Sequence, residues 1–294
     1  MGVCIEKGVI SADVKLPDMP DITVPQVDSG SGFEKSNADF DFGVYYIDVG
    51  QGDCQLIVSG DSAVLIDAGE AEYADKVCDF ISSLGIDKLD YVIGTHPHSD
   101  HIGGLPKVIS DFEVGKILVP KITGDMVPAS ETYENLLDAV SEKGMKLTAA
   151  RPGNTYELDG AELEILAPVM DSYDDLNDYS VVCRAVKGDT SFLFTGDASQ
   201  TSESDMNGSG QELSADVLKV GHHGSRSSST KKFLERVQPV ICVIGVGADN
   251  SYGHPTEEVL EKLGEYTDKI YRTDINGTVA IYSDGEQYYV KTEK

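Results

Sequence analysis

The chain has 294 residues, of which 40% are hydrophobic. This content suffices for one large core. No apolar run approaches the roughly 18 residues that a membrane-spanning helix needs. A formal net charge of −28 makes nonspecific adhesion to DNA or to an anionic membrane unfavourable. The five cysteines form no Cys-x-x-Cys pair, so the sequence indicates no disulfide framework.

Residues 1–42 are predicted to form an extended leader or linker, which could join the domain to an anchor. They show no sustained hydrophobic period and contain runs such as Leu16–Asp21 (LPDMPD) and Asp28–Gly32 (DSGSG), which favour irregular structure. The domain itself is expected to cover residues 43–294. A leader that had already been removed would leave no trace, so the sequence assigns no compartment.

The first part of the domain is predicted to contain strands followed by a helix. In Glu70–Leu84 apolar residues recur at spacings of three and four, and Gly85 follows as a stop signal, which is typical of an amphipathic helix. The glycines of Gly50–Gly52 favour a tight turn between the first two strands. The three expected strands are Val44–Val49, Gln55–Val58 and Ala63–Ile66.

The next strand, Tyr91–Gly94, leads into a loop that is rich in metal-type side chains. In an extended segment the alternating histidines of a His-x-His pair leave on one side, and imidazoles and carboxylates are ligands for zinc, manganese or iron. The loop therefore predicts a metal site, and a plain polar turn is the alternative. All six histidines of the chain fall into three clusters: His96, His98 and His101, which flank Asp100; His222 and His223; and His254.

Alternating elements continue after this loop and indicate α/β layering. A helix is expected from His101 to about Phe112, then a strand at Lys116–Val119 and an amphipathic helix over Tyr133–Val140. The acidic loop Asp171–Asp178 lacks the spaced ligands and the glycine of a calcium loop. The C-terminal part repeats the alternation and ends in a hairpin around Ser283–Gly285.

Two strands in the second half, Val181–Val186 and Ser191–Thr195, are predicted to pair and to present Asp197 at their end. A solvated turn residue is the alternative for Asp197. The Gly- and Ser-rich residues 201–211 are expected to form an exposed insertion.

These motifs resemble the metallo-β-lactamase superfamily and, within it, the soluble hydrolase domains of the ComEC-like competence branch. The resemblance implies a four-layer αββα sandwich with metal ions at one edge of the β-sandwich. It rests on His96–His101 and, in order, on Asp48–Asp53 (DVGQGD), Leu65–Gly69 (LIDAG), Phe194–Asp197 (FTGD), Asp216–Ser225 (DVLKVGHHGS) and Tyr252–Pro255 (YGHP).

The resemblance also implies two divalent ions, zinc or, as the alternative, manganese. His96 and His98 would hold the first ion, Asp100 and His101 would hold the second, and Asp197 would bridge both. Two ions about 3.5–4 Å apart can ionise a shared water, which then attacks a phosphorus or carbonyl centre.

The first site departs from the pattern of the superfamily. Many members supply another histidine to this site, but here no histidine lies between His101 and His222. The site is therefore expected to keep an open position or to be completed by water, Asn177 or Asp178.

The second ion is expected to take one histidine of the pair His222–His223 as well. Spacing leaves the choice open; we favour His222 as the ligand and His223 as a supporting or proton-transfer group. His254 is expected to line the pocket and to protonate a leaving group, with a structural histidine as the alternative. Asp67 is expected to brace the metal loop from behind.

The expected function is hydrolysis of a phosphodiester by a metal-bound hydroxide, without a covalent enzyme intermediate. The ComEC-like resemblance points to single-stranded DNA; a small head-group ester, as in surface phosphorylcholine esterases, is the alternative. A non-catalytic binding module that kept the fold is a further alternative. The sequence indicates no oligomeric state. The residues expected to act in catalysis are Asp100, Asp197, His223 and His254.

Overall fold

The computed structural model describes residues 28–29, 32–35 and 40–294. Most of the predicted leader, residues 1–42, therefore lies outside the described residues. Within its described part, β1 (Asp28–Ser29) pairs in parallel with β16 (Tyr288–Thr292), and the ring of Phe33 packs edge-on against Tyr45. Part of the predicted leader thus contacts the domain, and a domain boundary at residue 42 stays a prediction.

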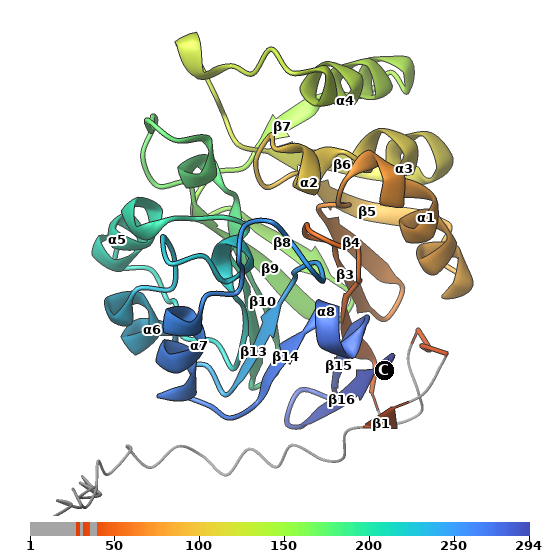
Figure 1. Cartoon of the computed structure of the whole chain (residues 1–294). Helices are drawn as coiled ribbons and strands as arrows, with labels where there is room; N and C mark the ends of the chain where they lie inside the picture. Colours follow the sequence, from red (N-terminus) through yellow and green to blue (C-terminus); the bar gives the residue numbers. More distant parts are fainter. Residues whose placement is uncertain (1–27, 30–31, 36–39) are drawn as a thin grey trace, which may run out of the picture.

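Two mixed sheets form the body of the protein (Figure 1). The first has nine strands in the order β1-β16-β15-β2-β3-β4-β5-β6-β7, and the second has seven in the order β14-β13-β12-β11-β10-β9-β8. The remaining strands of the first sheet are β2 (Phe42–Tyr46), β3 (Gln55–Ser59), β4 (Ser62–Ile66), β5 (Lys88–Ile93), β6 (Glu113–Val119), β7 (Leu147–Ala149) and β15 (Val279–Ser283). Those of the second are β8 (Thr155–Leu158), β9 (Ala161–Ala167), β10 (Val182–Lys187), β11 (Thr190–Phe194), β12 (Val217–Lys219), β13 (Ile241–Ile244) and β14 (Ile270–Arg272).

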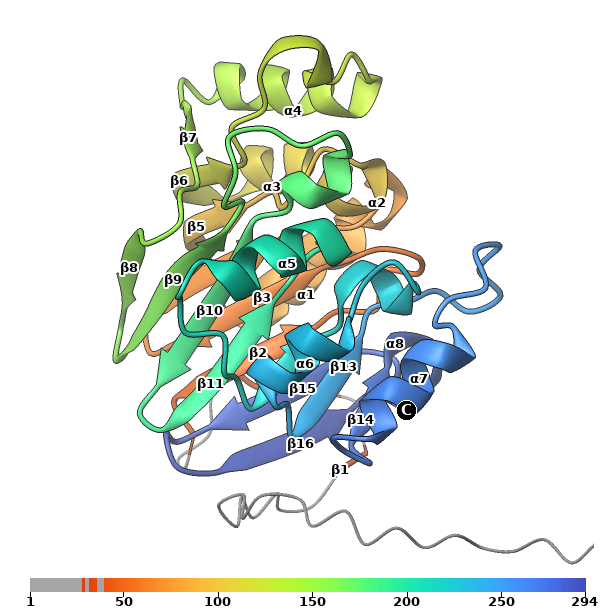
Figure 2. The same ribbon diagram turned by 90° about the vertical axis from the view of Figure 1, so that its left-hand side faces the viewer.

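The helices cover the outer faces of the two sheets, with α1 and α3 on one side and α5, α6 and α7 on the other (Figures 1 and 2). No helix among the described residues is both long and apolar enough to cross a bilayer. The helices are α1 (Ala74–Ser83), α2 (Ser99–Ile102), α3 (Leu105–Asp111), α4 (Glu131–Glu142), α5 (Gln200–Gly208), α6 (Lys231–Val237), α7 (Glu257–Gly264) and α8 (Thr273–Asn276), with short 3₁₀ turns η1 (Ala71–Tyr73), η2 (Gly124–Met126), η3 (Leu176–Tyr179) and η4 (Gly221–Gly224).

Side-chain alternation along the strands divides the core into three apolar layers, because successive residues of a strand point to opposite faces. On β2, Tyr45 joins the layer under α1 and α3, whereas Tyr46 joins the layer between the sheets. On β11, Phe192 joins the layer between the sheets and Leu193 the layer under α5, α6 and α7. This arrangement is the predicted four-layer αββα sandwich.

Two sequence-based expectations for helices need correction. The helix expected from His101 to Phe112 is divided into α2 and α3 at Gly103–Gly104; a Cβ on Gly104 would lie 2.4 Å from the Ala68 carbonyl oxygen. The main chain here approaches the neighbouring loop too closely for a larger residue.

The exposed insertion expected at residues 201–211 is wrong, because most of this segment is α5 and its inner face is buried. A distant side chain starts the helix: Asp178 Oδ1 accepts hydrogen bonds from the backbone N–H groups of Ser199 and Ser202. This satisfies donors that a helix start otherwise leaves unpaired.

Glu203 on α5 is a buried carboxylic acid that caps the start of α6. Its two oxygens accept hydrogen bonds from the backbone N–H groups of Ser229 and Thr230. Burial outweighs these hydrogen bonds and raises the pKa of Glu203 from 4.5 to about 7. The folded protein therefore holds a proton here that the unfolded chain releases, and stability falls as the pH rises from 4.5 through 7.

We expect Glu203→Gln to remove this pH dependence. The contribution of Glu203 to the free energy of unfolding should decline by about 3 kcal/mol between pH 4.5 and pH 7.5 in the wild type, whereas the amide cannot ionise. Urea unfolding at both pH values measures the difference. Equal pH dependence in the two proteins would contradict the prediction.

Candidate metal centre

All predicted metal ligands lie on loops or short helical turns that follow the C-terminal ends of strands. The ends of β11 and β12 are neighbours because these strands pair in parallel, and α/β folds gather their ligand sites at such ends. The loop after β5 and α2 carry His96, His98, Asp100 and His101, the turn after β11 carries Asp197, and η4 carries His222 and His223.

Four of these side chains form a compact group, and three of the four distances between their ligand atoms match the spacing of a tetrahedral metal site. The Nε2 atom of His101 lies 3.3 Å from Asp197 Oδ1 and 4.0 Å from Asp100 Oδ2. The Nε2 atom of His223 lies 3.6 Å from Asp197 Oδ1 and 3.3 Å from Asp100 Oδ2. Ligands about 2.0–2.2 Å from a zinc ion would be separated by roughly 3.3–3.6 Å. We call these four residues the second group.

The ligand atoms of the second group lack other partners. His101 Nε2, His223 Nε2 and Asp197 Oδ1 are buried and accept or donate no hydrogen bond. Buried polar atoms are nearly always paired, so three convergent unpaired atoms fit a divalent cation.

The far nitrogen of each histidine in the second group is held by an oxygen acceptor. His101 Nδ1 lies 2.7 Å from Asp67 Oδ2, and His223 Nδ1 lies 2.8 Å from the carbonyl oxygen of Gly245. A proton on each Nδ1 leaves the lone pair of Nε2 directed at the ion position, as in many metal sites.

Asp67 connects this arrangement to the start of the histidine loop. Its carboxylate also accepts hydrogen bonds from the backbone N–H and the hydroxyl of Thr95, at 2.7 and 2.6 Å. The residue has a left-handed φ of 57°, which a side chain other than glycine adopts at an energetic cost. Asp67 therefore lies directly behind the histidine loop, as expected.

The other oxygen of Asp197 faces a looser set of histidines. We call His96, His98 and His222 the first group. Asp197 Oδ2 lies 4.0 Å from His96 Nε2 and 3.5 Å from His222 Nε2, and His96 Nε2 lies 2.9 Å from His98 Nδ1. The two oxygens of Asp197 thus face different histidines. A carboxylate that bridges two ions needs this geometry.

The sequence analysis favours His222 in the second group, but the structure places His223 there and His222 beside the opposite oxygen of Asp197. Strand geometry does not apply to the pair, because both residues have left-handed φ angles, 49° and 53°. Consecutive left-handed residues let both side chains reach Asp197. We therefore propose His223, in place of His222, as the second-group ligand.

The structure also distinguishes between Asn177 and Asp178 as possible oxygen ligands of the first site. Asp178 uses Oδ1 to cap α5, and it is not among the residues that line the pocket. Asn177 lines the same pocket as His98 and Asp197, and its buried Oδ1 atom has no hydrogen-bond partner. Of these two residues, only Asn177 offers an oxygen to this pocket.

The groups open onto a pocket of about 310 Å³. His254 lies in this pocket beside His222, with ring centroids 5.7 Å apart. The exposed ring of Tyr252 stacks on His254 at 5.8 Å and 22°. Sequence reasoning missed Gln51 and Tyr252 as pocket residues; Tyr252 is part of the YGHP motif, but neither carries metal-type chemistry that would mark it.

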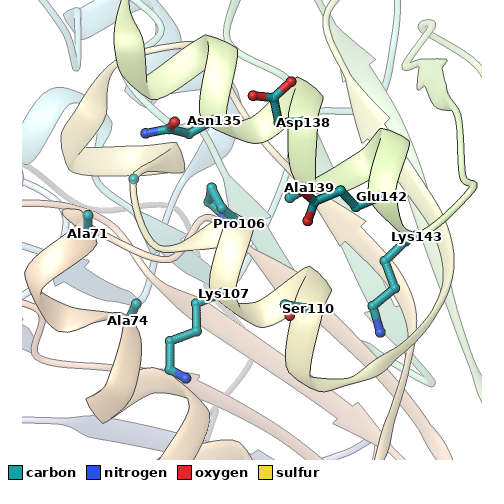
Figure 3. A pocket seen from close by; sticks show the side chains of 11 residues that line it. Ala71, Ala74, Pro106, Lys107, Ser110, Asn135, Asp138, Ala139, Glu142 and Lys143 are labelled. Carbon is teal, nitrogen blue, oxygen red and sulfur yellow. The ribbon is translucent and has the colours of Figure 1, made fainter.

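A larger hollow of about 650 Å³ lies elsewhere, between α3 and α4 (Figure 3). Its lining includes Lys107, Asp138, Glu142 and Lys143, whose charged ends are spread around the rim (Figure 3). None of the possible metal-binding groups found among the described residues lies there. Size alone therefore does not mark the site.

Burial and charge act against each other on the second group. Burial alone would raise the pKa of the Asp100 carboxyl, but the neighbouring imidazoles of His223 and His101 lower it. Burial would lower the pKa of His223, but mainly the charges of Asp197 and Asp53 raise it to about 10. A metal ion must displace this proton, so its binding should weaken as the pH falls.

Comparison with known proteins gives a family match over most of the chain. A sequence model of the metallo-beta-lactamase superfamily matches residues 47–246. That range includes every residue of both groups and excludes His254.

Curated relatives match the chain over part of their own length. The chain is 31% identical over 251 residues to ComE operon protein 3 of Bacillus subtilis (strain 168), covering 79% of this chain and 32% of that protein. It is 32% identical over 234 residues to competence protein ComA of Neisseria gonorrhoeae, covering 79% of this chain and 31% of that protein. The chain thus spans about a third of the length of these relatives.

Among solved structures, the fold is similar to that of the metallo-beta-lactamase fold protein YhfI from Bacillus subtilis. The TM-score is 0.51 at 15% sequence identity, and the match covers 79% of this chain and 96% of that chain. At this identity the likeness shows the fold alone, and it confirms the predicted architecture.

Replacing each histidine of the pair tests the assignment of the second group. His223→Ala should lose about one equivalent of bound metal, because an Nε2 ligand disappears, whereas His222→Ala should keep the second-group ion. Metal content after gel filtration measures this, with His254→Ala as the control that keeps both ions. Loss in His222→Ala together with full retention in His223→Ala would contradict the assignment.

Proposed function

Because the chain belongs to the metallo-beta-lactamase superfamily, we propose that it is a metal-dependent hydrolase that cleaves phosphodiesters with two divalent ions, zinc or manganese. The observation that carries the proposal is the second group, in which two buried imidazole nitrogens, His101 Nε2 and His223 Nε2, converge on Asp197 Oδ1 and none of the three atoms makes a hydrogen bond. A binding module that had lost its chemistry would have no need to keep these costly unpaired atoms.

Two ions held by these groups would activate water and polarise a phosphate oxygen. The chain's own residues would divide the remaining work. Asp100, His101 and His223 would hold the second ion, and Asp197, which has one oxygen toward each group, would be the ligand that both ions share. His254, which belongs to neither group, faces the pocket and is the proposed proton donor to the leaving group.

His222 lies between the metal groups and the pocket, which suits contact with substrate. Its Nε2 atom is next to Asp197 Oδ2, and its Nδ1 atom lies 3.2 Å from the hydroxyl of Ser227. Ser227 thereby orients the ring. We propose that His222 binds a phosphate oxygen when it does not bind the first ion.

The names of the relatives, one of which is a competence protein, support single-stranded DNA as the phosphodiester. The whole chain carries a net charge of −28 and would repel this polymer, but bound divalent ions reverse the sign locally. We therefore propose that nucleic acid is attracted only at the loaded pocket and not by the surface as a whole.

An exposed aromatic ring at the pocket also favours a nucleic acid. Tyr252 is 69% exposed, and its loop is braced by Asn250, whose amide nitrogen donates to the carbonyl oxygens of Gly247 and His254. A braced, exposed ring can stack a nucleobase that flanks the scissile phosphate. It could instead contact the quaternary ammonium of a choline head group.

We expect Tyr252→Ala to raise the KM for a short thymidine oligonucleotide about tenfold, since one lost stacking contact is worth about 1–3 kcal/mol. Tyr252→Phe keeps the ring and should behave like the wild type. Turnover of bis-p-nitrophenyl phosphate reports the intact metal centre, and Ile275→Ala, another exposed apolar residue, is the surface control.

The same assays separate the rival substrates. Cleavage of glycerophosphocholine with no cleavage of the oligonucleotide would replace nucleic acid by a head-group ester. No turnover of any phosphodiester by metal-loaded protein would overturn the proposed hydrolase and favour a binding module.

A further inference from the structure

We propose that the buried ion pair Asp53–Lys219 is a positioning device that fixes His223 for the second metal ion. This inference rests on the metal-dependent function proposed above. It assigns a role to one residue of the DVGQGD motif and to one of the DVLKVGHHGS motif that the catalytic scheme leaves without one.

Both members of the pair are completely shielded from solvent. Lys219 Nζ lies 2.6 Å from Asp53 Oδ2, and neither side chain has any exposed surface. Lys219 Nζ also donates a hydrogen bond to the Val220 carbonyl oxygen at 2.8 Å. Burying two charges costs free energy, and their mutual attraction often does no more than balance this cost. Apolar replacements of such pairs are therefore frequently neutral for stability. Stability alone therefore gives no reason for the pair at this place.

Asp53 directs its second oxygen at the ligand histidine. Asp53 Oδ1 lies 3.4 Å from His223 Nδ1, and the Gly245 carbonyl oxygen lies 2.8 Å from the same nitrogen. The hydrogen bond to Gly245 and the negative charge of Asp53 beside the same nitrogen orient the ring, so Nε2 on the other side faces Asp100 and Asp197. His223 needs such support because its left-handed backbone, with φ of 53°, is not a relaxed conformation.

The main chain around Asp53 joins this support to the metal loop. The N–H of Asp53 donates to the Asp100 carbonyl oxygen at 3.0 Å. A Cβ on Gly52 would lie 2.4 Å from that same Asp100 oxygen, and one on Gly245 would lie 2.6 Å from Asp53 Oδ1. These close approaches leave Asp53 little freedom to move, so one residue sets the relative position of Asp100 and His223.

Lys219 allows the carboxylate of Asp53 to lie beside His223 without adding an uncompensated negative charge. Asp67, Asp100 and Asp197 already surround His101 and His223. The ammonium group offsets the charge of Asp53, which can then lie beside His223 without drawing the ring away from the ion position. Lys219 lies on β12 and leads directly into η4, so the same strand supplies the counter-charge and the ligand.

The test removes the pair as a unit and measures metal binding. Asp53→Leu/Lys219→Met leaves no unpaired buried charge and should fold, as judged by circular dichroism and thermal unfolding. The affinity for the second zinc ion should fall about 10–100-fold, as is typical when support behind a metal ligand is lost. The affinity for the first ion should stay within about twofold.

Competition titration of the metal-free protein against a chromogenic zinc chelator resolves the two binding steps without any activity assay. The matched control is Asp41→Leu/Lys187→Met, which removes an ion pair of 2.8 Å at the surface and should bind both ions like the wild type. If Asp53→Leu/Lys219→Met does not fold, Asp53→Asn/Lys219→Gln takes its place and should show a weaker second step by at least threefold.

Unchanged affinity for the second ion in a folded double variant would overturn the positioning role and leave the pair as a structural feature. Equal weakening of both steps would overturn it as well, because a general loosening of the fold would explain that result. A wild type that binds no metal would instead overturn the proposed function, so the two failures are distinguishable.

Discussion

The centre depends on a buried carboxylate, Asp197, that must have positive partners on both of its oxygens. It is only 2% exposed, and a carboxylate without compensation is costly at such a depth. Oδ1 faces His101 and His223, whereas Oδ2 faces His96 and His222. Three loops from different parts of the chain must therefore meet around one side chain, and the two sheets of the sandwich hold the strand ends that make this possible.

Local strain is concentrated where the loops meet. Asp67, His222 and His223 all have left-handed φ angles, and each such residue costs roughly 1–2 kcal/mol relative to a relaxed backbone. The three apolar layers of the sandwich can sustain this cost, because the residues that carry them are almost completely buried. The glycines beside the site have the complementary role: at Gly196, with φ of 50°, a Cβ would lie 3.0 Å from the Thr95 side chain. The turn can hence bring Asp197 close to the histidine loop.

The part of the proposed centre that the sequence predicts best is local. The spacing of His96, His98, Asp100 and His101 after a buried strand predicts a metal-binding loop without reference to the rest of the chain. The alternation of strands and helices likewise indicates the layers. Which of His222 and His223 faces the second group was not predictable, because it depends on a left-handed backbone conformation that is not typical of histidine. The start of α5 was predictable only in part: Ser199 caps it locally through Thr201 N–H, but the further support from Asp178 comes from a distant part of the chain. The partnership of Asp53 with Lys219 joins the loop before β3 to β12 of the other sheet, and no local pattern encodes it.

The central proposal is that Asp197 is the shared ligand of two ions that together support phosphodiesterase activity. The most direct test compares the metal content of wild-type protein and Asp197→Ala, purified without chelator, together with their hydrolysis of bis-p-nitrophenyl phosphate. The account predicts close to two equivalents of transition metal and turnover in the wild type, and at most one equivalent with a loss of turnover of at least about a hundredfold in the variant. A wild type without metal, or turnover that is indifferent to Asp197, would contradict it.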